Sequence, residues 1–486
     1  MRTIVKKNII SIIVLGACVV SMQYLIGVHD YSARRIMRLS GGELCGTPTV
    51  APGLFETEKT TRVVADQAPY LSLVESGTGS PDTSGPVKKT GRLTSSLYES
   101  MLGKGNFVFS PYSLLDCMRI LYPAADGKSK EEFETILGLD RDRANVLEST
   151  DRENILQNGT GIRTANKAFI NSGIFETWND SGIFEAKDFH PEVLDADDVD
   201  IVPFRDDIYV EINEYVSEQT EGKIQDLLSP ENANRLTAAV LVNAIYYKNL
   251  WNHEERTILW EGSDAYEAFG NDVQTAQIKE FNGIDVLRLP YLNRTGSADA
   301  SGRPSVEIPG MHQYAMYIIA DSEDSASRGV DRFIAGMSEE EIYKVLDFSA
   351  YKGLPGYTSA HFTVPVFEMD SKASLKDMLQ EQGMTACFNP GTADFRRFAP
   401  VCISDVIQAA WIRADSGGTE AAAATAVVMK ELSAVPMNGK IKRVVADHTF
   451  AFFLKDDTAD EILFVGRVEN LSKCGVPGRG NTSESK

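Results

Sequence analysis

The sequence predicts an α+β fold, and two observations support this class. Segments with apolar residues at three- and four-residue spacing, the period of an amphipathic helix, lie mainly in the first half of the chain. Alternating or continuous apolar runs, typical of strands, lie mainly toward the end. The two kinds do not alternate in the βαβ rhythm of a parallel nucleotide-binding sheet, so that class of protein is not indicated.

The two patterns also predict where individual elements lie. The helical period predicts four helices, at residues 113–121, 130–137, 209–220 and 375–382. Strand patterns predict five strands, at residues 236–247, 314–319, 362–367, 450–454 and 462–465.

Length and composition bound the number of domains and the partners. At about 150 residues per domain, 486 residues give a prior of about three domains. However, no change in composition and no internal repeat divides residues 90–468. We therefore expect one domain at residues 90–473, followed by a tail at 474–486. The net charge of −21 repels phosphate backbones and anionic lipids, so nucleic acid is not an expected partner.

Residues 1–28 resemble a secretory signal, because three basic residues precede an apolar run at residues 9–20. The apolar stretch continues to Ile26, so two outcomes stay open: cleavage with secretion, or retention as a membrane anchor. Residues 29–89 are rich in Gly, Ser, Thr and Pro and predict a low-complexity extension. A similar patch at residues 293–309 predicts a surface loop insertion.

Sequons and cysteines fit a secreted chain without defining a disulfide framework. Five Asn-x-Ser/Thr sequons are candidate glycosylation sites, at Asn158, Asn179, Asn293, Asn470 and Asn481. Loss of Cys18 with the signal leaves five cysteines without close spacing, so the sequence predicts no metal site and no fixed disulfide pairing. We interpret most of them as buried free thiols. Whether Cys45 and Cys474 form a disulfide with each other stays an open alternative.

The segment 415–418, Asp-Ser-Gly-Gly, resembles the nucleophile loop of chymotrypsin-like proteases. An active protease using Ser416 would also need a histidine base and an orienting aspartate on a double β-barrel. His361 lies only a short way before Ser416, and no histidine of the chain stands in the Ala-Ala-His-Cys setting of those enzymes. We interpret the four residues as a glycine-containing turn and keep the protease as a remote alternative.

The segment after this turn has a period of two. An alanine-rich helix is the simplest interpretation of residues 418–429, but the flanking glycines and the β-branched residues disfavour it. As a strand, the segment places small side chains on one face, at Thr419, Ala421, Ala423, Thr425 and Val427. Such a strand fits between existing strands at little steric cost.

These residues resemble the proximal hinge of the reactive-centre loop of serpins, and further motifs follow in the family's order. Residues 106–113 resemble an early Asn-x-x-x-Ser-Pro-x-Ser signature, and residues 241–248 with Trp251 resemble the family's most recognisable segment. Later matches are found at residues 364–367, 393–395, 446–450 and 464–468, so the resemblance covers about residues 90–471.

The resemblance implies a metastable fold of three β-sheets with eight or nine helices and an exposed reactive-centre loop. In this family a serine protease attacks the loop and forms an acyl-enzyme, after which the loop inserts into the main sheet and traps the protease. About fourteen residues at roughly 3.3 Å each give an inserted strand about 45 Å long. The hinge would comprise Gly417, Gly418, Thr419, Glu420, Ala421, Ala422, Ala423, Ala424 and Thr425.

The family's usual interval after Gly418 places the reactive bond between Leu432 and Ser433. A leucine suits chymotrypsin-like or elastase-like proteases. Two alternatives remain open: Lys430, which would suit a trypsin-like or subtilisin-like protease, and Met437, because the segment before Phe450 is longer than expected.

The resemblance also implies a polar cluster that controls the opening of the sheet, at Ser110, Ser113, Asn243 and Gln408. Gln408 replaces the family's usual histidine, and Ser416 replaces the usual glutamate before the hinge. Gln408 still donates and accepts hydrogen bonds. Loss of the glutamate removes an expected ion pair near the insertion point, which puts the stability of the closed-loop form in question more than inhibition.

The leading hypothesis is a secreted, monomeric suicide inhibitor of serine proteases without a cofactor. The alternative is a non-inhibitory serpin that acts as a carrier or chaperone, if Gln408 and Ser416 prevent loop insertion. No heparin site is expected, because residues 106–167 contain no dense Lys/Arg cluster.

Overall fold

The computed structural model describes residues 93–145, 147, 161–181, 190–252, 256–260, 266–273, 277–292, 294–298, 304–307, 312–323, 329–357, 359–419 and 440–469. All of them belong to one compact unit, Gly85–Lys486. The predicted signal and the low-complexity extension lie outside the described residues. Among the helices that are described, none has the length and apolar character needed to cross a membrane.

Eight α-helices are described, together with two short 3₁₀ helices, η2 (Tyr122–Ala124) and η4 (Pro191–Val193). The four helices expected from the apolar period are confirmed as α3, α4, α7 and α10. The full set is α2 (Leu93–Met101), α3 (Pro111–Arg119), α4 (Gly127–Thr135), α6 (Ser172–Ser181), α7 (Ile208–Gln219), α8 (Val330–Ala335), α9 (Glu339–Leu346) and α10 (Lys376–Glu381).

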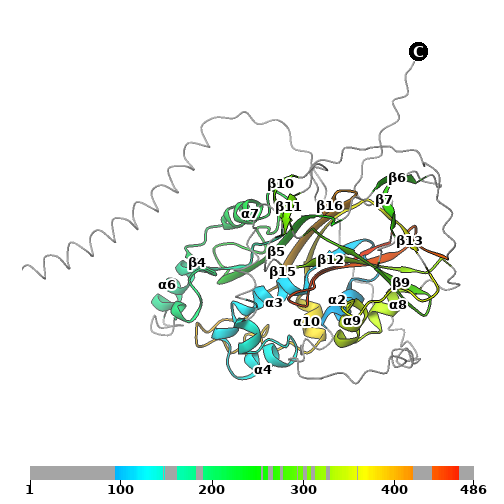
Figure 1. Cartoon of the computed structure of the whole chain (residues 1–486). Helices are drawn as coiled ribbons and strands as arrows, with labels where there is room; N and C mark the ends of the chain where they lie inside the picture. The colour runs from blue at the N-terminus through cyan, green and yellow to red at the C-terminus, as the bar shows by residue number, and fades with distance from the viewer. Residues whose placement is uncertain are drawn as a thin grey trace, which may run out of the picture. The chain divides into compact units, whose positions relative to one another are not determined.

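The main sheet has seven strands and runs through the centre of the view in Figure 1. Strands β2 (Gly161–Thr164) and β3 (Lys167–Asn171) both pair with β5 (Ala239–Leu250), one after the other, so these two short strands cover one edge of β5. The remaining strands have the order β14 (Phe367–Ser374), β15 (Ile407–Asp415), β16 (Gly418–Thr419), β5 (Ala239–Leu250), β3 (Lys167–Asn171) and β4 (Val199–Val202).

Two further sheets complete the fold and confirm the predicted α+β class with three sheets. The six-stranded sheet has the order β1 (Phe107–Phe109), β19 (Glu461–Val468), β18 (Phe450–Asp456), β12 (Tyr314–Asp321), β9 (Ile284–Pro290) and β8 (Gln277–Phe281). The four-stranded sheet has the order β17 (Ile441–Val445), β13 (Ser359–Pro365), β7 (Tyr266–Val273) and β6 (Arg256–Trp260).

The predicted surface insertion contains secondary structure of its own. Strands β10 (Arg294–Ala298) and β11 (Pro304–Glu307) pair as an antiparallel hairpin. The base of this hairpin is tied to the main sheet, because the amide of Leu292 donates to the carbonyl of Leu250, at the end of β5 (2.7 Å).

Strand β5 is buried on both faces, which explains its continuous apolar sequence. Side chains such as Leu241 and Ile245 contact the large core shared with the six-stranded sheet. The alternate side chains, including Val242 and Tyr246, contact a second core that α7 covers. Because side chains alternate along a strand, Asn243 lies on the same face of β5 as Leu241 and Ile245, which is the face toward the large core.

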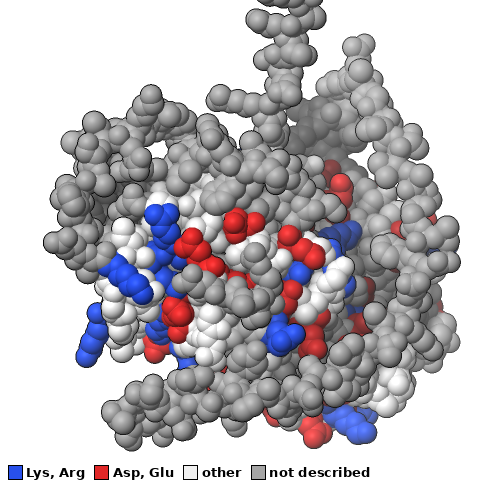
Figure 2. Space-filling view, turned by 90° about the vertical axis from the view of Figure 1, so that its right-hand side faces the viewer, with Lys and Arg blue, Asp and Glu red and all other residues white. Residues whose placement is uncertain are grey.

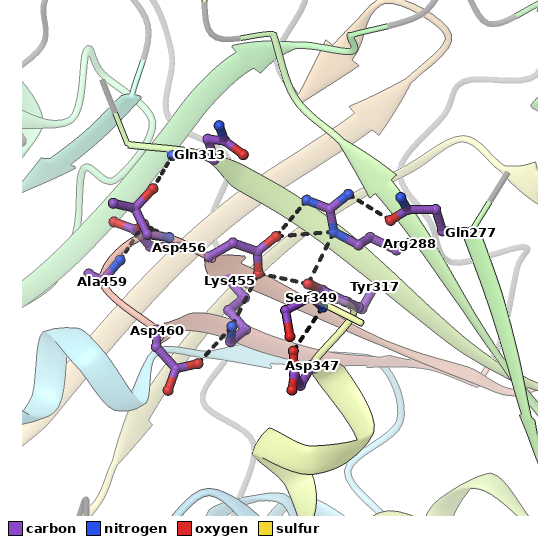
Figure 3. A network of polar contacts seen from close by, with 12 residues as sticks. Gln277, Arg288, Gln313, Tyr317, Asp347, Ser349, Lys455, Asp456, Ala459 and Asp460 are labelled. Carbon is purple, nitrogen blue, oxygen red and sulfur yellow. Dashed lines mark hydrogen bonds and ion pairs between the residues drawn. The ribbon is translucent and has the colours of Figure 1, made fainter. Parts of the chain in front are cut away.

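A polar network ties the turn after β18 to the six-stranded sheet (Figure 3). Arg288 of β9 donates to Asp457 (2.7 Å), and the hydroxyl of Tyr317 on β12 donates to the same carboxylate (2.7 Å). Lys455 is buried and pairs with Asp457 and Asp460. Burial lowers the pKa of Lys455, but the two carboxylates more than offset this effect and hold the pKa above its ordinary value. The network therefore fixes three strands relative to one another.

Candidate functional site at the opening of the main sheet

The candidate site lies where β5 and β15 separate. The two strands pair in parallel from Ile407 to Trp411, which face Val242 to Tyr246. Beyond this stretch β16 lies between them and pairs antiparallel with both. The chain therefore turns back after β15 and begins a new strand inside the sheet.

Gly418 is the residue that enters the sheet first. Its partners are Leu250 on β5 and Asp415 on β15. A Cβ atom at this position would lie 2.2 Å from the carbonyl oxygen of Asn249, a distance that real Cβ atoms do not adopt. Its φ of 150° is also rare for residues with a side chain. Only glycine fits here without displacement of the backbone.

Thr419 follows and is fully buried, opposite Asn249 and Ala414. Its hydroxyl shares a hydrogen bond with the hydroxyl of Tyr291. Burial raises the pKa of the Tyr291 phenol, so this hydroxyl keeps its proton. The first hinge side chain to enter the sheet thus has a defined polar partner.

Trp251 fixes the turn that precedes β16. Its indole nitrogen donates to the carbonyl of Asp415 (2.7 Å), and its amide donates to the carbonyl of Gly417 (3.2 Å). The Asp415 carboxylate in turn accepts from the amide of Gly417 (2.8 Å). Trp251 also stacks on Tyr291, with ring centroids 4.5 Å apart. The hydrogen bonds from Trp251 and from the Asp415 carboxylate, together with the packing of Trp251 on Tyr291, thus fix the turn that precedes β16.

The structure describes part of the predicted hinge only. Gly417 lies in the turn after β15, and Gly418 and Thr419 form β16. The other predicted hinge residues and the candidate reactive bond lie outside the described residues: Glu420, Ala421, Ala422, Ala423, Ala424, Thr425, Lys430, Leu432, Ser433 and Met437.

The structure brings together the four residues of the predicted polar cluster, which are all buried. Gln408 of β15 accepts from the amide of Ser110 and donates to its carbonyl, both at 2.8 Å. Its amide nitrogen also donates to Asn243 of β5 (3.1 Å). Ser113 donates to Asn243 (3.0 Å), whose side chain donates back to the carbonyl of Ser113 (2.7 Å). One set of hydrogen bonds therefore joins α3 to the neighbouring strands β5 and β15.

Two further residues belong to this cluster and were not predicted from the sequence. Asn166 lies between β2 and β3 and donates to Asp116 of α3 (2.7 Å), while its oxygen accepts from Ser113 (3.1 Å). Cys117 donates from its sulfur to the carbonyl of Val242 (3.2 Å). Asn166 gave no signal, because it stands among other polar residues, Arg163, Thr164 and Lys167. Cys117 gave no signal, because it matches any buried residue of an amphipathic helix.

The family comparison can be judged against this geometry. A family model described as serpin (serine protease inhibitor) matches residues 88–471, most of the chain. The chain belongs to the serpin family. Fold and sequence agree, because the described residues have the three β-sheets and the eight helices that the resemblance implies.

Relatives of this serpin include inhibitors by name. The leukocyte elastase inhibitor of Xenopus laevis is 28% identical and covers 75% of this chain and 92% of its own. Antichymotrypsin-2 of Bombyx mori is 26% identical and covers 76% of this chain and 93% of its own. Among solved structures, Serpin48 of the insect Tenebrio molitor has a TM-score of 0.55 at 20% identity, covering 77% of this chain and 95% of that chain.

The serpin fold removes the basis of the protease alternative. Ser416 lies in the turn after β15 of the seven-stranded sheet, whereas His361 lies on β13 of the four-stranded sheet. The described residues form three sheets, not the double β-barrel that a chymotrypsin-like triad needs. The Asp-Ser-Gly-Gly sequence is explained by the turn into β16.

Among the predicted glycosylation sites and cysteines, the described residues contain one sequon and three cysteines. Asn179 lies in α6, and the other four sequons lie outside the described residues. Cys117, Cys387 and Cys402 are free thiols, and burial raises the pKa of each. Cys45 and Cys474 lie outside the described residues, so their pairing stays open.

Proposed function

We propose that this serpin is a secreted suicide inhibitor of serine proteases. The observation that carries the proposal is β16, in which Gly418 and Thr419 already form two residues of the strand that trapping requires. A loop that starts inside the sheet needs to lengthen an existing strand and not to nucleate a new one.

The sequence beyond β16 supports insertion. Thr419 points into the buried side of the sheet, and alternate residues beyond it are Ala421, Ala423 and Thr425. None carries a charge or a ring, so none would meet a steric or desolvation barrier on entering the core.

The target is proposed to be a chymotrypsin-like or elastase-like protease. The serine of the protease would attack the carbonyl carbon of Leu432, form an ester with it and release the amino group of Ser433. Two relatives with chymotrypsin and elastase inhibition in their names support this class. Lys430 and Met437 remain the alternatives for the attacked residue.

Secretion, a monomeric state and independence from polyanions complete the proposal. On the face drawn in Figure 2, basic and acidic side chains of the described residues are interspersed, without a continuous basic surface. The net charge of −21 also opposes binding to a polyanion.

A non-inhibitory carrier or chaperone is the second candidate. Two departures from the family pattern favour it, Gln408 in the polar cluster and Ser416 before the hinge. Gln408 nevertheless satisfies both backbone groups of Ser110, so its presence does not by itself leave the cluster incomplete.

The deciding experiment incubates the protein with chymotrypsin, elastase and trypsin and looks for a covalent complex on a denaturing gel. We expect a complex with chymotrypsin or elastase, and mass analysis should find a released peptide that begins at Ser433. Cleavage of the loop by every protease without any complex would support the carrier instead.

A matched pair of variants tests whether insertion is the cause. Thr425→Arg places a charge on the buried face of the inserted strand and should convert the protein from inhibitor to substrate. Ala424→Arg places the same charge on the opposite face and should retain most of the complex. Equal behaviour of the two variants would contradict trapping by strand insertion.

A further inference from the structure

The hinge of this serpin has one side-chain hydrogen bond that no motif of the sequence indicates, between Tyr291 and Thr419. The two residues are 128 positions apart. Tyr291 lies between β9 and the inserted hairpin of β10 and β11, so it belongs neither to the main sheet nor to the reactive-centre loop.

The position of the Tyr291 hydroxyl is fixed by the packing of its ring. The ring stacks on Trp251 at 4.5 Å and meets the edge of Tyr247 at 5.1 Å, and only 4% of the residue is exposed. Its amide donates to the carbonyl of Tyr314 (2.9 Å). A phenol held in this way has few other orientations, so it presents its hydroxyl to Thr419 without further ordering.

The bond distinguishes two positions of the hinge. When Thr419 lies in the sheet, its hydroxyl and that of Tyr291 satisfy each other in a buried place. When the hinge withdraws, Tyr291 keeps its buried site and loses its partner, which is unfavourable. Full insertion leaves Thr419 where it is, because the strand lengthens from β16. The bond therefore opposes withdrawal alone and does not resist insertion.

We propose that Tyr291 is a positioning residue that holds the hinge in the sheet before the protease arrives. This inference rests on the proposed function, and it adds that the hydrogen bond of Tyr291 sets how soon loop insertion begins. Insertion competes with hydrolysis of the acyl-enzyme, so a hinge that has withdrawn gives the protease more time to escape. Tyr291 would thus determine the fraction of encounters that end in trapping.

Tyr291→Phe tests the proposal by removal of one oxygen, and Tyr246→Phe is the matched control. Tyr246 is also buried, lies on β5 of the same sheet, and has a hydroxyl without a hydrogen-bond partner among the described residues. We expect Tyr291→Phe to increase hydrogen exchange of the peptide 415–419 about twofold to tenfold, the range of one net hydrogen bond. Tyr246→Phe should leave this exchange unchanged.

The second measurement is the number of inhibitor molecules consumed per protease trapped. Tyr291→Phe and Thr419→Val should both raise this ratio, and the double variant Tyr291→Phe/Thr419→Val should raise it no further than either single variant. Thr419→Ser keeps the hydroxyl and should therefore have the ratio of the wild-type protein. The rate of first cleavage should not fall. A Tyr291→Phe protein that exchanges and traps like Tyr246→Phe would overturn the proposal. If the wild-type protein traps no protease, the proposed function fails, and the exchange measurement still decides the role of Tyr291.

Discussion

At position 418, a glycine has a hydrogen atom where other residues have a side chain, and this allows β16 to lie between β5 and β15. The carbonyl of Asn249 and the Cα of Leu250 lie where a side chain would begin. The family resemblance assigns Gly418 to the hinge, where a glycine permits backbone rotation. The structure adds a second reason, which is the close approach of β5.

Gly418→Ala should therefore displace β16 from the sheet. The new methyl group would lie 2.2 Å from the carbonyl oxygen of Asn249, and relief of this contact requires the strands to separate. We expect faster hydrogen exchange at residues 416–419 and a loss of about 1–3 kcal/mol of stability. Gly329→Ala is the control, because its methyl would meet no atom closer than 3.8 Å. Equal exchange in the two variants would show that β16 is not held by this contact.

The residue scale is also where the sequence predicted least. Gly417, Gly418 and Thr419 could be named because they are consecutive and carry a pattern. Tyr291 and Asn166 could not, because their roles depend on contacts across 128 and 53 residues respectively. No local period encodes which distant side chain a hydroxyl will meet.

At the scale of elements, the polar cluster acts as a joint between α3 and the strands β5 and β15. Gln408 accepts from the buried amide of Ser110 and donates to the Ser110 carbonyl, which also accepts from the amide of Leu114 in α3. Opening of the sheet must either break these hydrogen bonds or move the bonded groups together. The number of these bonds therefore sets part of the free-energy barrier to opening.

Gln408→Ala should lower the barrier, because it leaves the buried amide of Ser110 without a partner and removes one of the two hydrogen bonds to the Ser110 carbonyl. We expect a loss of about 2 kcal/mol in stability and faster spontaneous loop insertion during incubation at moderate temperature. Gln408→His retains a donor and an acceptor and should lose less, while Gln382→Ala alters an exposed glutamine and should lose nothing. The thermal midpoint measures the first effect. An unchanged midpoint in Gln408→Ala would contradict a role of the cluster in closure.

Elements with a clear apolar period were predicted better than the others, whatever their length. Apolar periods located α3, α4, α7 and α10 to within a few residues, whereas α2 and α6, of nine and ten residues, were not predicted. The two residues of β16 were predicted only as the start of a longer segment with a period of two, and the hairpin of β10 and β11 was predicted only as a loop. Its sequence has the Gly, Ser and Pro content of a loop, and pairing rather than composition defines its strands.

At the scale of the whole molecule, the length prior of three domains fails for a physical reason. The main sheet recruits strands from residue 161 to residue 419, and its core is continuous with that of the six-stranded sheet. A chain that must admit one more strand needs a wide, shared core and cannot divide it among three small ones.

Cleavage of the reactive-centre loop should make the whole molecule more resistant to heat. On the proposed function the native state persists for kinetic reasons, and an inserted strand would add ladder bonds on both sides. We expect the thermal midpoint to rise by at least about 10 °C after the loop is nicked by a protease that is not trapped. Thr425→Arg provides the control, because its loop is cleaved but should not insert. A nicked wild-type protein that melts no higher than the intact one would contradict a metastable native state.

The parallel junction between β5 and β15 gives loop insertion a direction. Five residue pairs join these strands, and a chain that lengthens β16 runs antiparallel to both. Each added residue exchanges part of one slanted parallel ladder for parts of two perpendicular antiparallel ladders, which are more stable per residue. Every step is then downhill, and reversal would have to rebuild the weaker pairing. On the proposed function the protein would act once, and the orientation of two neighbouring strands would make insertion irreversible.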